Sequence, residues 1–135
     1  AQCRRLGITR DVIFTGYHPN IPLVQSLLTI QVFPSLWEGT PLTLFEAMAM
    51  GRPIVSTAVD GLGEVLRDGE TARLVAPRDP TQLAEAIEDL LANPEKAARL
   101  AAQGLQESRQ FDIQRTVEAL ERIYEELVGA CDSPA

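Results

Sequence analysis

IQVFPSLWEGTPLTLFEAMAMGRPIVST, residues 30–57, is the part of the sequence that predicts the architecture of this protein. Its two ends, 30–33 and 53–57, are short apolar runs with β-branched residues, as buried strands have. Between them lie a loop, 34–40, and an apolar run, 41–50, that a proline opens and a glycine follows, as in a helix. A strand, a helix and a second strand in this order predict a βαβ unit with parallel strands.

The same alternation continues on both sides of this unit. Two further apolar runs, 12–15 (VIFT) and 72–75, are predicted to be strands. Residues 21–28 are predicted to form a short helix, 58–63 a loop and 64–67 a helical turn. The predicted fold class is therefore α/β, with a Rossmann-like parallel sheet and flanking helices in a single domain over residues 1–135.

The helical C-terminal part, residues 79–130, begins at capping signals. Asp79 and Asn93 each precede a proline and are predicted to cap a helix, and Asp112 is predicted to cap a third one. The third helix is expected to keep these apolar side chains inside: Val117, Leu120, Ile123, Tyr124 and Leu127. At the other end, residues 1–10 are interpreted as the remnant of a preceding helix, which Gly7 ends.

Composition excludes several classes of function. The net charge of −7 argues against a general nucleic-acid binder, because phosphates are bound by Lys and Arg. No apolar run approaches the roughly 18 residues that span a bilayer. A single histidine makes a histidine-based metal site improbable. Cys3 and Cys131 form no close pair, which favours reduced thiols and a cytoplasmic location.

Three loops are predicted at the carboxyl ends of the strands, where ligands bind in open parallel sheets: 16–20, 34–40 and 58–63. The second of these leads into the helix over 41–50, for which Thr40 is a candidate cap. Gly39 allows a close approach of backbone to a ligand, and the helix start can bind a phosphate through free N–H groups. The helix is apolar nearly all round, so it is expected to be buried.

Two carboxylates flank this predicted anion site. Glu46 interrupts the apolar helix one turn after Thr43, and Glu38 stands in the loop ahead of it. Carboxylates accept hydrogen bonds from sugar hydroxyls while backbone N–H groups hold a diphosphate, which together suit a nucleotide sugar. Two other interpretations stay open, namely that Glu38 is an ordinary loop carboxylate and that Glu46 forms a structural ion pair with an arginine.

An ordered series of motifs resembles one enzyme family. The series is VIFTG, FPS, EGTPLTLFEAMAMGRPIVST, GLGEVLRDGETARLV and PRDPTQLAEAIEDLL, over about residues 11–127. It is similar to the donor-binding domain of the retaining glycosyltransferases of family 4, which have the GT-B fold and the E-x7-E motif. The resemblance implies the donor-binding half of an enzyme that moves a hexose from a nucleoside-diphosphate sugar to an acceptor hydroxyl, with no metal and no other cofactor.

The resemblance also implies roles for individual residues. Glu38 matches the first glutamate of the motif, which contacts the donor sugar near the reaction centre, and Glu46 matches the second, which binds ribose hydroxyls. Gly16 and Tyr17 match the loop near the nucleobase, and Gly61 and Glu64 match a G-x-x-E element. The residues that match the stretch approaching the sugar and diphosphate are Gly39, Thr40, Pro41, Leu42 and Thr43.

The sequence departs from the family pattern in two ways. Asp60 stands where the family often has a glycine, and it would repel a diphosphate unless it points away. In the family, two further strands, a basic pair and an acceptor-binding N-terminal domain precede the matched region, so the match is expected to be N-terminally truncated and the chain alone inactive. In the full-length protein the resemblance also allows a place at the cytoplasmic face of a membrane.

Strands 12–15 and 30–33 would flank the two missing strands in the family order. An unsatisfied sheet edge invites association, so a homodimer or a rearranged sheet is expected. The alternative to a transferase is a non-catalytic module for nucleotide binding or oligomerisation, derived from the same family.

Overall fold

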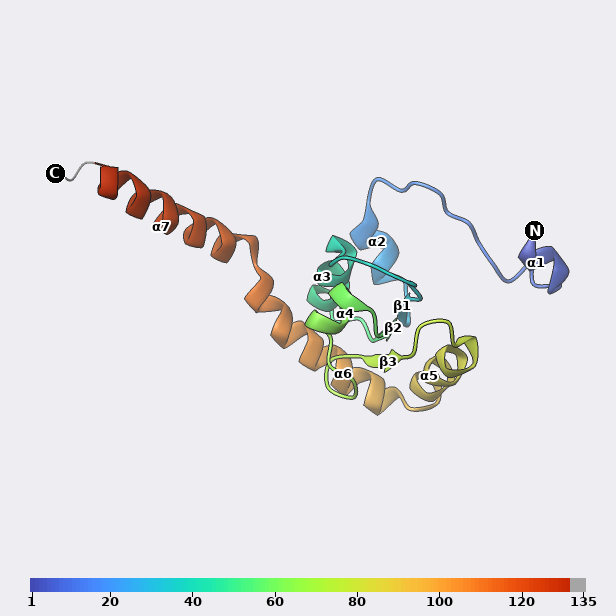
Figure 1. Ribbon diagram of the computed structural model, residues 1–135. Helices are drawn as coiled ribbons and strands as arrows, with labels where there is room; N and C mark the ends of the chain where they lie inside the picture. Colours follow the sequence, from blue (N-terminus) through green and yellow to red (C-terminus); the bar gives the residue numbers. More distant parts are fainter. Residues whose placement is uncertain (132–135) are drawn as a thin grey trace.

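The computed structural model describes the backbone of residues 1–131 and the side chains of residues 1–128. Figure 1 shows the order of the elements along the chain. The elements are α1 (Gln2–Arg5), α2 (Ile21–Ser26), β1 (Gln31–Phe33), α3 (Leu42–Ala49), β2 (Ile54–Thr57), α4 (Asp60–Val65), β3 (Arg73–Val75), α5 (Pro80–Ala92), α6 (Pro94–Ser108), a 3-10 turn η1 (Arg109–Phe111) and α7 (Ile113–Cys131).

The sheet has three parallel strands in the order β1-β2-β3. Val32 pairs with Val55, and Ser56 pairs with Leu74. All four residues of β2 are buried, because this central strand is covered on both faces, as strands of parallel sheets are. The predicted α/β architecture is therefore confirmed.

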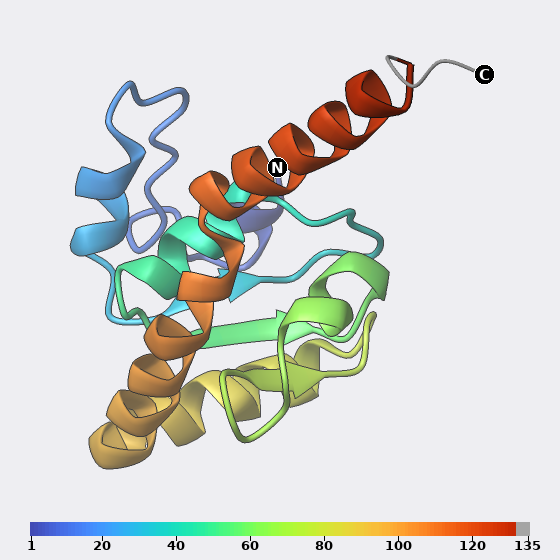
Figure 2. The ribbon, with the colours of Figure 1, turned by 90° about the vertical axis from the view of Figure 1, so that its left-hand side faces the viewer.

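Two apolar clusters cover the two faces of the sheet. Ile54 of β2 packs on one face with Leu44 and Met48 of α3 and Leu62 of α4. Its neighbour Val55 points to the other face, where it packs with residues of α5 and α6. Figure 2 shows α6 running alongside α3, and Phe45 of α3 meets Phe111 of η1 with the ring centroids 4.7 Å apart.

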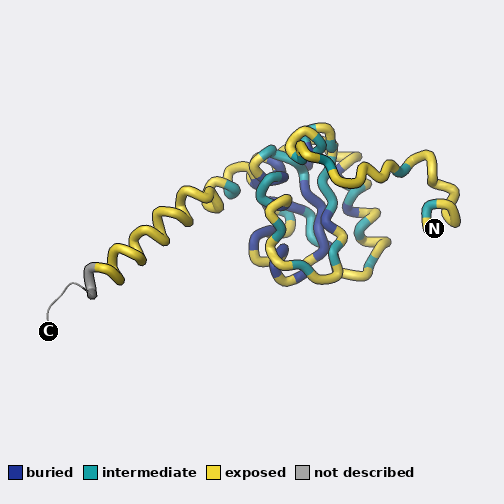
Figure 3. The backbone as a smooth tube through the Cα atoms, turned by 90° about the horizontal axis from the view of Figure 1, so that it is seen from above, coloured by how far each residue is buried: buried dark blue, intermediate teal, exposed yellow. Residues whose placement is uncertain are grey.

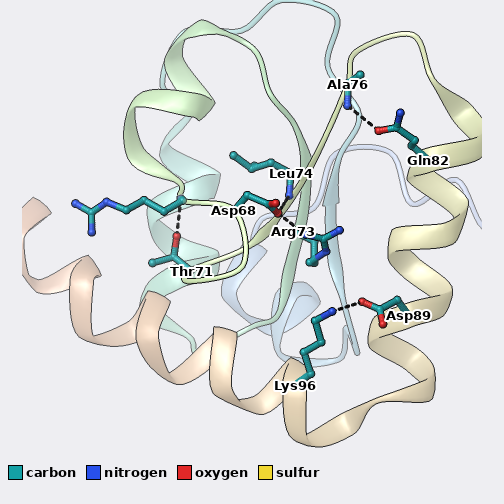
Figure 4. A network of polar contacts seen from close by, with 9 residues as sticks. Asp68, Thr71, Arg73, Leu74, Ala76, Gln82, Asp89 and Lys96 are labelled. Atoms are coloured by element: carbon teal, nitrogen blue, oxygen red, sulfur yellow. Dashed lines mark hydrogen bonds and ion pairs between the residues drawn. The ribbon is translucent and has the colours of Figure 1, made fainter.

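Polar contacts fix the turn before β3 and the corner between α5 and α6 (Figure 4). The Asp68 carboxylate accepts from Arg73 Nη1 at 2.6 Å and from the Leu74 N–H at 2.9 Å. Lys96 Nζ donates to Asp89 Oδ2 at 2.6 Å, which ties α6 to α5. These contacts lie on β3 and the helices beside it, so they stabilise the scaffold of the sheet.

The predicted helix caps are confirmed at two of three positions. Asp79 Oδ1 accepts from the Gln82 N–H at 2.9 Å, and Asp112 Oδ1 accepts from the Gln114 N–H at 2.9 Å. Asn93 occupies the N-cap position of α6, as predicted, but its side chain makes no cap hydrogen bond. Its Nδ2 instead donates to the carbonyl and carboxylate of Asp89, one turn back in α5, so its oxygen caps no N–H of α6.

The predicted strand at residues 12–15 is absent. The segment has no regular secondary structure, and Ile13 and Phe14 are 85% and 83% exposed. A strand needs a neighbour for its N–H and C=O groups, and the described chain places no strand beside this one. β1 keeps an open edge, and the arm that contains residues 12–15 reaches away from the sheet (Figure 1).

The expectation that α7 buries its apolar side chains was also wrong. Figure 3 shows α7 as an exposed helix that leaves the body of the molecule. The residues expected inside are all exposed: Val117, Leu120, Ile123, Tyr124 and Leu127. The helical period was recognised correctly, but periodicity identifies an apolar face without identifying what covers it.

Several boundaries differ from the prediction. The helix over 21–28 ends at Ser26, and the strand over 72–75 begins at Arg73. The loop predicted over 58–63 gives way to α4 from Asp60, although Gly61 and Gly63 are poor helix formers. Within residues 1–131, no helix is both long enough and apolar enough to cross a membrane.

Candidate functional site

The candidate site lies where β1 and β2 end. Because both strands are parallel, the loops that follow them leave the sheet at the same edge. Thr57, the last residue of β2, donates its hydroxyl to the Ser35 carbonyl at 2.6 Å, so it holds the loop after β1 against β2. This contact fixes the start of the segment that carries Glu38.

Glu38 is half-buried in this loop, and its carboxylate has a partner three residues back. Ser35 donates its hydroxyl to Glu38 Oε2 at 3.0 Å. The Glu38 carbonyl also accepts the Gly61 N–H at 3.2 Å, from the first turn of α4. The Glu38 side chain is thus bonded within its own loop, while its backbone is tied to the first turn of α4.

The backbones at Gly39 and Gly61 touch. A Cβ atom added to Gly61 would lie 2.2 Å from the Gly39 carbonyl oxygen and 2.8 Å from the Thr40 nitrogen. Any side chain at position 61 would therefore force the loop and α4 apart. The structure brings Glu38, Gly39, Thr40 and Gly61 together, as the sequence analysis implied.

The prediction that Thr40 caps the helix was wrong. The N-cap of α3 is Pro41, which makes no side-chain cap, and Thr40 instead donates its hydroxyl to the Gly61 carbonyl at 3.4 Å. The first N–H groups of α3 are therefore left without a side-chain acceptor. The expectation of burial all round α3 fails at the same place, because Leu42 is 77% exposed.

Glu46 is half-buried on α3, and its partner is a glutamine rather than the arginine considered from sequence. Gln25 Nε2 donates to Glu46 Oε2 and to the Thr43 carbonyl, at 3.3 Å in each case. A single amide therefore contacts both the Thr43 backbone and the Glu46 carboxylate on α3. Sequence reasoning did not select Gln25. The available signal was one amide within the largely apolar run IPLVQSLL at 21–28.

Asp60 and Glu64 lie beside a pocket of about 370 Å³ at the start of α4. Ala58, Val59 and Gly63 complete its lining, and the two acidic residues are exposed. A diphosphate in this pocket would meet two carboxylates. Among the described residues no cluster of His, Cys, Asp and Glu could hold a metal ion.

Gly16 and Tyr17 lie on the exposed arm before α2. Gly16 has φ +62°, a conformation that suits glycine, and Tyr17 is 92% exposed. The aromatic ring is thus available to a ligand but has not been brought to Glu38 or Glu46 by any contact of the described chain.

Electrostatically, the site combines acceptors and donors. Glu38 and Glu46 offer carboxylate oxygens that can accept from hydroxyl groups, and the uncapped start of α3 offers backbone N–H groups to an anion. A ligand that carries both hydroxyls and a phosphate fits this arrangement.

Comparison with known proteins gives a consistent result. The sequence model of the family described as "Glycosyl transferases group 1" matches residues 1–93. The chain is 33% identical over 127 residues to the lipopolysaccharide core biosynthesis mannosyltransferase LpsB of Rhizobium meliloti (strain 1021), a match that covers 92% of this chain and 36% of that protein.

Solved structures agree with the sequence comparison. Sucrose-phosphate synthase (tll1590) from Thermosynechococcus elongatus superimposes with a TM-score of 0.88 and 30% identity, covering 96% of this chain and 33% of that one. Anabaena Alr3699/HepE in complex with UDP superimposes with a TM-score of 0.83 and 27% identity, covering 95% and 35%. The chain spans about a third of the length of the relatives it matches.

Proposed function

Because the chain belongs to the glycosyl transferases group 1 family, we propose that it binds the nucleoside-diphosphate sugar from which a sugar is transferred. The observation that carries the proposal is the joined loop edge, where Glu38 and the start of α3 are held against α4 through Gly61. Support also comes from the relative Alr3699/HepE, which was solved with UDP.

In the proposed complex Glu46 accepts hydrogen bonds from the ribose hydroxyls, and Glu38 contacts the donor sugar. The N–H groups at the start of α3 bind the diphosphate, whose negative charge grows as the bond to the sugar breaks. Donors fixed before the reaction stabilise that charge without reorganising, which is how backbone groups accelerate such a step. Tyr17 and Gly16 are proposed to approach the nucleobase, and Glu64 the donor.

The finer features of the proposal follow from the family resemblance. The transferred sugar is a hexose, its anomeric configuration is retained and no metal ion takes part. The acceptor hydroxyl binds to another domain, so the 135-residue chain alone does not complete the transfer. The reaction takes place in the cytoplasm, where a full-length enzyme can also work at the membrane face.

A second candidate function is nucleotide binding without transfer. It is favoured by Asp60, whose carboxylate lies beside the pocket at the start of α4 and opposes a diphosphate there.

We also propose that two copies associate through the open edge of β1. Sedimentation of the chain at several concentrations tests this association, and a monomer at all of them would contradict it.

Calorimetric titration of the chain with UDP, GDP, ADP and their sugar conjugates tests donor binding. Selective binding of one nucleotide is expected, and Glu46→Ala is expected to weaken it by about tenfold to a hundredfold, because hydrogen bonds to a charged group contribute about 1.5–3 kcal/mol. Glu88→Ala, at an exposed carboxylate on α5, is the matched control and should not change affinity. A nucleotide affinity of Glu46→Ala equal to that of the wild type would contradict the ribose contact. Sugar transfer by a longer protein that contains this chain would favour the transferase over nucleotide binding without transfer.

A further inference from the structure

Gln25 of α2 is 2% exposed, and it is the one buried residue of that short helix. Its Nε2 group donates to the Thr43 carbonyl and to Glu46 Oε2, both on α3. A single amide thus joins the backbone of α3 to the carboxylate that projects from the next turn. Gln25 and Glu46 are 21 residues apart in the sequence, so this contact links α2 to the candidate site.

The orientation of the amide is determined by its neighbours. Both atoms that face it, a carbonyl and a carboxylate oxygen, are acceptors, so the nitrogen rather than the oxygen must point toward α3. The remaining oxygen, Gln25 Oε1, is buried with no hydrogen-bond partner among the described residues. Because a buried acceptor without a partner disfavours the folded state, packing alone would favour an apolar residue here.

We propose that Gln25 is a positioning residue for Glu46, an inference that rests on the proposed function. By holding Oε2, it fixes the rotamer of the carboxylate and leaves Oε1 as the oxygen available to a ligand hydroxyl. A free glutamate side chain loses rotamer entropy when a ligand orders it, and Gln25 removes much of that loss in advance. Gln25 therefore acts on ligand affinity through Glu46 without touching the ligand.

Gln25→Leu separates positioning from a structural role. The substitution keeps a buried side chain of similar size and removes the unpaired oxygen, so the midpoint of urea unfolding is expected to stay or rise. UDP affinity, measured by calorimetry, is expected to fall about tenfold, which corresponds to about 1.4 kcal/mol. Loss of stability and affinity together would overturn the proposal, because a merely structural residue behaves in that way.

A double-mutant cycle identifies the route of the effect. In a Glu46→Ala background, Gln25→Leu is expected to change UDP affinity less than twofold, because the group that it positions is gone. An equal loss in both backgrounds would overturn the proposal. Gln82→Leu is the matched control, since Gln82 lies on α5 and its amide oxygen accepts from the Ala76 N–H instead.

A measurement without ligand separates failure of this inference from failure of the proposed function. The side-chain amide protons of Gln25 are observed by NMR in the 135-residue chain and in Glu46→Ala. The proton that donates to Oε2 is expected to move upfield when the carboxylate is removed, while the Gln82 amide stays in place. An unmoved Gln25 amide overturns the positioning role. A moved amide in a chain that binds neither UDP, GDP nor ADP supports the contact and contradicts the proposed function.

Discussion

Replacing Gly61 by alanine places one methyl group where two backbones meet. The added Cβ would lie 2.2 Å from the Gly39 carbonyl oxygen, whereas ordinary contacts begin at about 3.4 Å. The far side of the contact is backbone, so no side chain can turn aside. The loop after β1 and the start of α4 must therefore move apart by more than 1 Å.

The expected loss of stability can be worked from the contacts. Separation stretches the hydrogen bond from the Gly61 N–H to the Glu38 carbonyl and the one from the Thr40 hydroxyl to the Gly61 carbonyl, at about 1 kcal/mol each. Overpacking by the methyl group costs about 1–3 kcal/mol. This cost overlaps with the loss of the two hydrogen bonds, because separating the backbones relieves the clash while it breaks the bonds. We expect the free energy of unfolding to fall by about 3 kcal/mol.

Urea unfolding and nucleotide titration are the assays. The same displacement moves Glu38 and the start of α3 together, so the nucleotide affinity is expected to fall along with the stability. Gly63→Ala is the control, because that glycine lies on the same helix with nothing within 4 Å of its added Cβ. It should stabilise α4 by up to about 1 kcal/mol. A Gly61→Ala variant as stable as Gly63→Ala, with unchanged nucleotide affinity, would refute the reasoning.

Four further substitutions test the scaffold. Arg78 has φ +64°, so Arg78→Gly should raise the free energy of unfolding by about 0.5–1 kcal/mol in urea titrations, and a loss would contradict backbone strain there. Asp79→Ala should cost about 1 kcal/mol of unfolding free energy and Asn93→Ala clearly less, because only the Asp79 side chain accepts a hydrogen bond from a helix N–H; equal costs would be inconsistent with the observed bonds. The hydrogen bond from Lys96 holds the pKa of Asp89 below its usual range. A carboxyl group with a lowered pKa in the folded state stabilises that state at a pH above its ordinary pKa. The stabilisation is lost as the pH falls through the pKa of the folded state. The stability difference between the wild type and Lys96→Met should therefore shrink below about pH 4, and a pH-independent difference would contradict the coupling.

The local sequence pattern was sufficient to predict an element where the pattern of apolar residues and the helix-start and helix-end signals agree. The βαβ unit at 30–57 combines β-branched runs, a proline at the helix start and Gly51 with φ +60° at its end, and all of these act within a few residues. Glu46 was selected in the same way, because a carboxylate within an apolar helix stands out. Gln25 was missed because an amide in a short apolar run carries no sign of the partner that it meets 21 residues later.

Sequence by itself therefore determined most of the helical segments, α4 being the exception, together with the parallel pairing of β1 and β2 and the positions of the acidic residues that follow the strands. Tertiary structure decided what each apolar face and each polar group meets. Residues 12–15 have the composition of a strand but no neighbour to pair with, and α7 has an apolar face that the described chain leaves uncovered. Gly61 lies in the first turn of α4 against its propensity, because only a residue without a Cβ fits against Gly39. Propensity and periodicity act within one segment, whereas pairing, burial and close approach depend on a second segment that the local sequence does not specify.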